Sequence, residues 1–165
     1  MDNSTISIRD AKPEDCDQII TLIQEFADFG EAPNGPSITA DTLRKDGFGE
    51  EKMFRCFVAA DGNCLVAFAL YFFNYSTWEG VYVYLNDLYV TPSYRKRGIG
   101  TQLMRKVAQV AIDRKCTRLD WLCLGGNEQA IEFYKSKGSV NLTTEEDWNL
   151  FRLSGDKLHA FANNV

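Results

Sequence analysis

The sequence has 165 residues, a mass of 18.7 kDa, 45% hydrophobic residues and 25% charged residues, which suits one domain over residues 1–165 with a substantial core. A net charge of −5 and a pI of about 4.9 argue against a nucleic-acid partner, because nucleic acid needs a broad basic surface. The start lacks a secretory signal pattern, and no apolar run approaches the roughly 18 residues of a membrane span, so we expect a cytoplasmic protein with no membrane partner.

The first third of the chain predicts a strand, two helices and a loop between them. Residues 5 to 9 alternate as a strand does. Apolar residues at helical spacing predict a helix from 13 to about 29. Residues 30 to 36 hold two glycines and two prolines, which is typical of a loop. Thr39 is then suited to cap a short helix that ends at Gly47.

The middle of the chain predicts strands. Residues 55 to 60 and 64 to 73 are apolar runs joined by the turn 61 to 63, which favours a hairpin. Further strands are expected at 81 to 90 and 118 to 124.

The last quarter predicts a helix, a strand and a second helix. Asn127 is a suitable cap for a helix that closes at Gly138. A late strand at 148 to 153 and a terminal helix at 157 to 162 follow. The expected fold class is therefore α/β (α+β), with a mixed, mostly antiparallel sheet and helices on both faces.

Five cysteines are scattered over the chain: Cys16, Cys56, Cys64, Cys116 and Cys123. None forms a C-x-x-C pair, so neither a zinc site nor a disulfide framework is indicated. We expect buried free thiols and no metal.

The most informative stretch is the basic, glycine-containing turn after the strand at 81 to 90. It reads Arg95-Lys96-Arg97-Gly98-Ile99-Gly100-Thr101 and leads into an amphipathic helix. The first N–H groups of a helix lack internal partners and carry the positive end of its dipole, so glycines there let an anion approach. With the added charge and hydroxyl, the turn suits a diphosphate. A solvated connection between strand and helix has a similar composition, and the turn alone does not separate the two interpretations.

The pattern Arg95-x-x-Gly98-x-Gly100 resembles the R-x-x-G-x-G signature of the GNAT superfamily of acetyl-coenzyme A-dependent N-acetyltransferases. Further segments are similar to its diamine (spermidine/spermine) and thialysine branch, and they extend the resemblance over nearly the whole chain: residues 46–50, 71–78, 85–90, 94–100, 127–128, 133–135, Gly138 and 145–148. The resemblance implies the GNAT fold, a homodimer, and direct transfer of acetyl to a small amine in a ternary complex, with Cys123 left in the core.

The resemblance also implies a set of residues that bind acetyl-CoA. Backbone groups of the strand before the turn hold the pantetheine arm, the turn holds the pyrophosphate, and the next helix contributes beside them. The implied residues are Leu88, Tyr89, Val90, Arg95, Lys96, Arg97, Gly98, Ile99, Gly100, Thr101, Asn127, Ala130 and Tyr134.

The chemistry requires a neutral amine and a proton for the departing thiolate. An alkyl ammonium titrates near ~10.4, so its deprotonation costs about 4 kcal/mol near neutral pH. Tyr134 matches the family's general acid. Asn86 replaces the glutamate of the polyamine enzymes, and we expect it to hold a water that relays the proton, while the adjacent Asp87 provides charge.

The acceptor side is implied less specifically, by Asn86, Asp87, Asp120, Trp121, Leu122 and Glu146. Asp120 and Glu146 either bind a distal ammonium or are ordinary exposed acids. The carboxylate lost at Asn86 and the altered family loop, with Gly125-Gly126, favour a smaller amine such as thialysine or a related diamine over a polyamine. Two alternatives stay open: a CoA-binding regulatory module with weak or no turnover, and a protein or peptide acetyltransferase.

Overall fold

The computed structural model describes residues 6–32, 34–146 and 149–163. The chain divides into two compact units, Met1–Leu122 and Cys123–Val165. Among the described residues, no helix combines the length and apolar character needed to cross a bilayer.

The first unit is built on a five-stranded sheet in the order β1-β2-β3-β4-β5. Its strands are β1 Ser7–Asp10, β2 Arg55–Asp61, β3 Cys64–Ser76, β4 Gly80–Val90 and β5 Leu119–Trp121. Neighbouring strands are antiparallel except for the parallel pair β4 and β5. The mixed, mostly antiparallel sheet predicted from the sequence is therefore confirmed.

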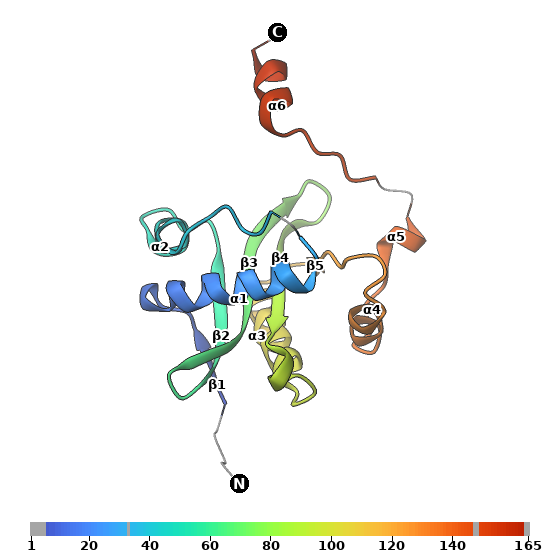
Figure 1. Ribbon diagram of the computed structural model, residues 1–165. Helices are drawn as coiled ribbons and strands as arrows, with labels where there is room; N and C mark the ends of the chain where they lie inside the picture. The colour runs from blue at the N-terminus through green and yellow to red at the C-terminus, as the bar shows by residue number, and fades with distance from the viewer. Residues whose placement is uncertain (1–5, 33, 147–148, 164–165) are drawn as a thin grey trace. The chain divides into compact units, whose positions relative to one another are not determined.

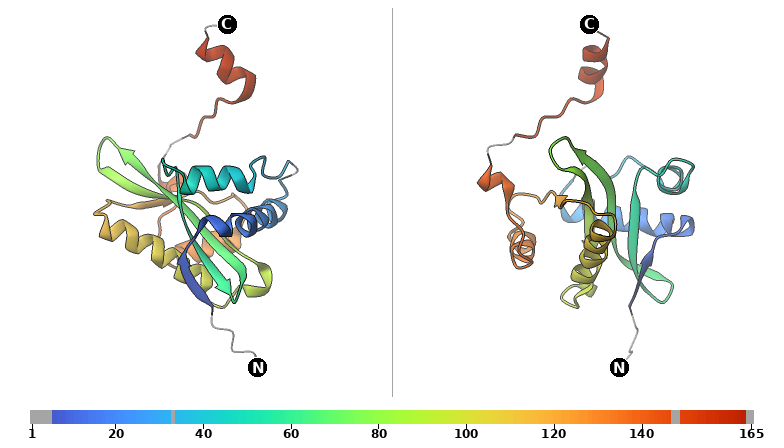
Figure 2. Two further views of the ribbon diagram at one scale, coloured as in Figure 1. Left: turned by 90° about the vertical axis from the view of Figure 1, so that its left-hand side faces the viewer. Right: turned by 180° about the vertical axis from the view of Figure 1, so that it is seen from behind.

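Helices cover both faces of this sheet (Figure 1). The 3-10 turn η1 Pro13–Asp15 leads into α1 Cys16–Phe29, and α2 Ala40–Phe48 follows on the same side. A second 3-10 turn, η2 Pro92–Tyr94, precedes α3 Ile99–Asp113, which crosses the opposite face (Figure 2). The helices expected at 13–29 and after Thr39 are thus confirmed, and the Thr39 hydroxyl accepts a hydrogen bond from the Thr42 N–H, as a cap does.

Two hydrophobic clusters fill the space between the helices and the sheet. On the α3 face, Leu103 and Val107 pack with Val83 and Leu85 of β4. The second cluster, on the α1 and α2 face, consists of Cys16, Ile19, Leu22, Leu43, Cys56, Val58, Ala60, Leu65, Phe68, Leu70 and Tyr89. Because strand side chains alternate, β4 contributes to both clusters.

The second unit holds short helices: α4 Glu128–Lys135, α5 Leu142–Glu145 and α6 Gly155–Ala162. The Asn127 Oδ1 accepts from the Ala130 N–H at 3.2 Å, so the predicted cap of α4 is confirmed. The predicted terminal helix is also present and begins two residues earlier than expected.

Several predictions on local structure were wrong. β5 stops at Trp121 instead of 124. Residues 149–153 form no strand, and Trp148 lies outside the described residues. Their apolar side chains favoured a strand, yet Leu150 and Phe151 are 77% and 89% exposed, so no ladder buries them. All five cysteines are free, but Cys64 and Cys123 are exposed. Cys123 follows the end of β5, where the chain leaves the sheet, so it is not a core residue.

The end of α2 offers a test of the packing. The Gly49 N–H donates to the Lys45 carbonyl at 3.0 Å, and a Cβ at Gly49 would clash with that same oxygen. We expect Gly49→Ala to lower the free energy of unfolding by about 1–3 kcal/mol, as in other overpacked sites. Urea denaturation measures it. Gly125→Ala is the control, because its Cβ would meet nothing within 4 Å, and an equal loss in both variants would contradict the assignment.

Candidate active site

The site begins at an irregularity in β4. Leu70 pairs with Asp87 and Tyr71 pairs with Leu85, so Asn86 is an extra residue on β4. Such a β-bulge bends its strand and re-aims the side chains beyond it. Asn86, where the family resemblance implies a glutamate, therefore lies at the bend. No residue pattern in the sequence indicated this bulge.

Next to the bulge, β4 and β5 separate. Their parallel register runs from Val83↔Leu119 to Leu85↔Trp121 and ends there. Within the described residues, the part of β4 from 86 to 90 has no strand paired to it on the β5 side. An open strand edge can pair with an extended ligand that carries amide groups. Residues 88 to 90, the predicted site of the pantetheine arm, lie on this edge.

The turn at the end of β4 leads directly to the N-terminus of α3. Gly98 is the N-cap and has a φ of +79°, a left-handed conformation that glycine adopts without strain. No side chain caps this end of the helix. The N–H groups of Ile99, Gly100 and Thr101 belong to the first turn, where helices lack internal acceptors. A small anion can therefore reach them.

Arg95 braces the turn against the rest of the first unit. Its Nε donates to the Val90 carbonyl at 2.9 Å, and its guanidinium lies over the rings of Phe29 at 4.7 Å and Tyr89 at 5.6 Å. The guanidinium therefore links α1, β4 and the turn. Phe29 was missed by sequence reasoning, because an aromatic residue at a helix end gives no signal of its own.

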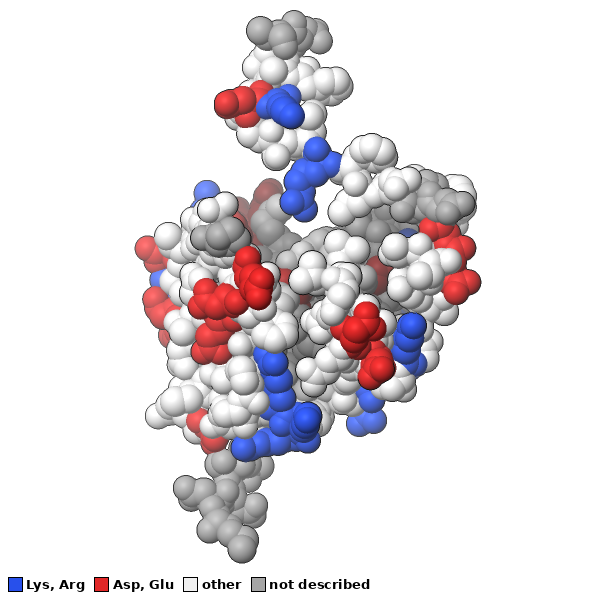
Figure 3. All heavy atoms as spheres, turned by 45° about the vertical axis from the view of Figure 1, so that its right-hand side comes forward, with Lys and Arg blue, Asp and Glu red and all other residues white. Residues whose placement is uncertain are grey.

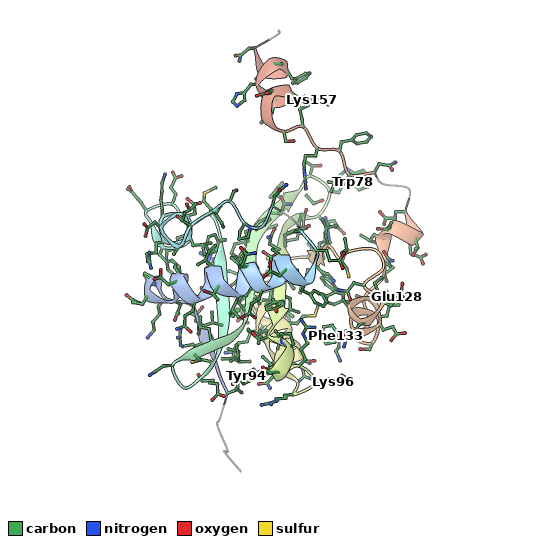
Figure 4. The ribbon with its side chains drawn as sticks, viewed as in Figure 1. Trp78, Tyr94, Lys96, Glu128, Phe133 and Lys157 are labelled. Atoms are coloured by element: carbon green, nitrogen blue, oxygen red, sulfur yellow. The ribbon has the colours of Figure 1, made fainter. Side chains whose placement is uncertain are left out.

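Arg97 is held in a similar way. Its guanidinium lies 4.9 Å from the centre of the Tyr94 ring, and the Tyr94 hydroxyl donates to Asp61 at 2.8 Å. Lys96 has a φ of +61° at the outer part of the turn. Figure 4 shows Lys96 near the end of β4 that lies opposite the hairpin with Trp78. In the view of Figure 3, basic side chains gather in the lower part of the surface.

A second feature lies on the α1 and α2 face of β4. The Asn86 Nδ2 donates to the Asp87 carboxylate at 2.7 Å. Burial raises the pKa of Asp87, and the Asn86 hydrogen bond opposes that shift. Asp87 is consequently a carboxylate whose proton affinity is above that of an exposed aspartate, which suits a group that takes up a proton.

Aromatic residues continue this face along the sheet. The rings of Phe72 and Tyr84 stack with centroids 5.2 Å apart. The pKa of Tyr84 is raised by burial, and then by the charges of Tyr82, Asp120 and Asp87. The charges of Asp87 and Asp120 therefore both act on Tyr84, and the β4–β5 register pairs Tyr84 directly with Asp120.

The structure separates the three positions predicted on the acceptor side in β5 and directly after it. Asp120 pairs with Arg118, whose Nε lies 2.9 Å from Asp120 Oδ2. Trp121 is packed against the α3-side cluster, so it faces away from Asp120. Leu122 is 67% exposed after the end of β5. Only Asp120 shares the face of Asp87 and Tyr84.

The remaining predicted residues lie in the second unit: Asn127, Ala130, Tyr134 and Glu146. Burial raises the pKa of Tyr134 to about 12, with a further contribution from Cys123. Phe133 packs edge-on against Tyr134, with centroids 5.3 Å apart. Glu146 is exposed just after α5. Tyr134 is therefore a phenol that keeps its proton at any physiological pH.

The sequence has close relatives of known activity. Residues 19–138 match the Acetyltransferase (GNAT) family. The chain is 40% identical over 165 residues to the thialysine N-epsilon-acetyltransferase of Bos taurus, covering 95% of this chain and 97% of the relative.

Solved structures have the same fold. An integron cassette protein of V. cholerae superposes with a TM-score of 0.78 at 26% identity, covering 95% of this chain and 97% of the other. An aminoglycoside N-acetyltransferase solved in complex with CoA gives a TM-score of 0.72 at 19% identity, covering 91% and 95% of the two chains.

Proposed function

This chain belongs to the Acetyltransferase (GNAT) family and is an N-acetyltransferase that uses acetyl-CoA, and from that premise we propose that its acceptor is the primary amine of a small diamine, polyamine or thialysine-like molecule. The observation that carries the proposal is the open edge of β4 beside an uncapped helix N-terminus, with an acidic and aromatic face next to the bulge. The similarity to thialysine N-epsilon-acetyltransferase supports the same acceptor class.

We propose that the first unit holds acetyl-CoA by its backbone. The edge of residues 88 to 90 binds the pantetheine arm, and the first turn of α3 from Ile99 to Thr101 binds the diphosphate. Gly98 supports this role, because its left-handed conformation opens the helix end without a side chain. Lys96 and Arg97 add positive charge, and Arg95 fixes the turn. Asn127 and Ala130 of the second unit complete the proposed set, and no metal ion takes part.

For the acceptor, we propose that Asp87 attracts the ammonium and takes its proton, directly or through one water held by Asn86. The pKa of an exposed aspartate is far below that of an alkyl ammonium, so it competes poorly for the ammonium proton. The raised pKa of Asp87 makes the gap between the two pKa values smaller. The neutral amine then attacks the thioester carbonyl: the C–N bond forms, the C–S bond breaks, and the nitrogen gives up its second proton to solvent, which leaves the amide and the CoA thiolate. Trp121, Leu122 and Glu146 remain in the proposed acceptor set on the family resemblance alone.

We propose that Tyr134 donates its phenolic proton to the departing thiolate. A phenol with a pKa of about 12 is fully protonated at the start of each turnover. The alternative of a covalent intermediate on Cys123 is less favourable, because partial desolvation, with the charge of Glu128 in second place, raises the pKa of this thiol and so lowers its thiolate fraction. Direct transfer between the two bound substrates therefore fits the side chains better.

The test is thiol release from acetyl-CoA by the purified protein with diamines, polyamines, thialysine and peptides as acceptors. We expect saturable turnover with small amines. Acetyl-CoA binding without turnover on any acceptor would instead support a regulatory module, which the relatives do not favour. Turnover on peptides alone would move the proposal to protein acetylation.

Asn86 gives a sharper test of the acceptor pocket. We expect Asn86→Glu to raise kcat/KM for spermidine by about 10-fold, because a second carboxylate beside Asp87 attracts a polycation and adds a base. Asn86→Gln is the control, since it lengthens the side chain without charge. Steady-state kinetics on both variants decides the matter. No gain with Glu would mean that the pocket has been remodelled beyond this position.

Three further properties belong to the proposal. The family match runs across the boundary between the two compact units, which supports one acetyltransferase domain over residues 1–165. Five free cysteines support a reducing, cytoplasmic location. A homodimer follows from the family resemblance, and sedimentation or light scattering on the pure protein tests it. The proposal includes no nucleic-acid or membrane partner.

A further inference from the structure

Arg118 occupies a position on the proposed acceptor face that its sequence context did not indicate. It immediately precedes β5, and its carbonyl accepts from the Val83 N–H at 3.1 Å. Its side chain binds Asp120 on one side and Glu79 on the other, while its guanidinium lies 4.1 Å from the centre of the Tyr82 ring. The residue therefore stands in a row of alternating charges, Glu79, Arg118 and Asp120.

The guanidinium is held in place but retains donors for a ligand. Nε is used by Asp120 and Nη1 by Glu79. An arginine side chain has five N–H donors, so those on Nη2 are available in the part of the chain that the structure describes. The side chain is 34% exposed, so a ligand can reach it. The guanidinium also lies over the ring of Tyr82, whose hydroxyl accepts from Asn74 at 2.7 Å, so a third contact holds it in place.

This row of charges lies on the same face as Asp87. Tyr82, Tyr84 and Asp120 share that face by strand alternation and register, and Tyr84 is influenced by the charges of both Asp120 and Asp87. An acceptor whose reacting amine lies at Asp87 and whose body lies along Tyr84 thus brings its far end to Arg118. The far end then meets one cation between two anions.

Different acceptors present different charges at that end. A diamine or polyamine presents a second bare ammonium, which the positive charge of Arg118 repels although Asp120 and Glu79 attract it. An amino acid with a side-chain amine presents an ammonium and a carboxylate together. Its carboxylate accepts from the Nη2 group of Arg118, and its ammonium lies near the flanking acids. The charges of the row match the second kind of acceptor better.

We infer that Arg118 is a specificity-determining residue, which selects acceptors that end in a zwitterionic amino-acid group over those that end in a second bare ammonium. The inference rests on the proposed function, since it concerns the same acceptor face. It also limits Asp120 as a simple partner for a distal ammonium, because the Asp120 carboxylate is already engaged by Arg118.

The experiment uses two pairs of acceptors that differ only in the α-carboxylate: lysine with cadaverine, and thialysine with its decarboxylated form. For each pair, the ratio of kcat/KM values is measured on the full chain. We expect the wild-type protein to prefer the carboxylate-bearing member. We expect Arg118→Gln to lower that ratio by about 10-fold or more, mainly through KM, as is usual for a lost charge-assisted hydrogen bond.

Two further variants separate selectivity from general damage. Arg118→Lys keeps the charge but loses the Nη2 donors, so its ratio should lie between those of the wild type and Arg118→Gln. Arg114→Gln removes the same charge beside Phe73 on the α3 face, and its ratio should equal that of the wild type. An unchanged ratio in Arg118→Gln would overturn the inference and leave the proposed function intact. A wild-type protein that acetylates none of these four amines would also overturn the inference, and it would overturn the proposed function only if polyamines were not acetylated either.

Discussion

Replacing Tyr134 by phenylalanine should lower kcat by about 10²-fold or more, with the KM for acetyl-CoA changed by less than about twofold. The expected loss is the usual contribution of a general acid, because the variant keeps the ring and removes only the proton donor. The pKa of about 12 also fixes the pH dependence. An acid acts while it is protonated, so its contribution is present below the pKa and is lost above it. Wild-type kcat should therefore show no fall between pH 7 and 10.

The matched control is Tyr75→Phe, which makes the same chemical change at a side chain that is 68% exposed on the β3–β4 hairpin. Its kcat should stay within about twofold of the wild-type value. Stopped-flow or steady-state thiol release over the pH range measures both variants. If Tyr134→Phe kept its full kcat, or if it lost acetyl-CoA binding in proportion, Tyr134 would have no role as the acid.

The arrangement of strands and helices was largely readable from the sequence, since hydrophobic periodicity reports directly which side of an element is buried. Leu103 and Val107 recur at helical spacing and pack on the α3 face. Thr39 and Asn127 were recognised as caps because a short polar side chain directly before a helical pattern can accept a hydrogen bond from the first N–H groups of the helix. Gly98 was recognised as part of an anion-binding turn because the basic residues around it lie between a predicted strand and a predicted helix.

The geometry around Asn86 could not be predicted in the same way. A β-bulge depends on which residue of β3 pairs with which residue of β4. The hydrophobic pattern of a single strand does not determine this pairing. The same limit applies to Arg118, whose partners come from the β3–β4 hairpin and from β5. The late strand predicted at 148–153 is absent over its described part, 149–153, for the opposite reason. Its local pattern was correct for a strand, but a strand also needs a neighbour with a free edge.

The first turn of α3 offers the second large effect. We expect Gly100→Asp to raise the Kd of acetyl-CoA by about 10²-fold. A carboxylate there would lie beside the proposed diphosphate, and two unit charges about 5 Å apart repel by about 3 kcal/mol at an effective dielectric constant of 20. The fold should tolerate the change, because a Cβ at Gly100 would meet the Val90 Cγ2 at 3.7 Å, an ordinary contact. Calorimetry with acetyl-CoA measures the affinity.

The control is Gly100→Asn, which has nearly the same size and shape and no charge. Steric hindrance would weaken binding equally in both variants, whereas repulsion of a diphosphate would affect Asp far more. Salt screens exposed charges, so raising the ionic strength should bring the two Kd values closer together. Equal affinities of the Asp and Asn variants at low salt would place the diphosphate away from this helix end. In that case the open edge of β4 would have to hold acetyl-CoA without the first turn of α3.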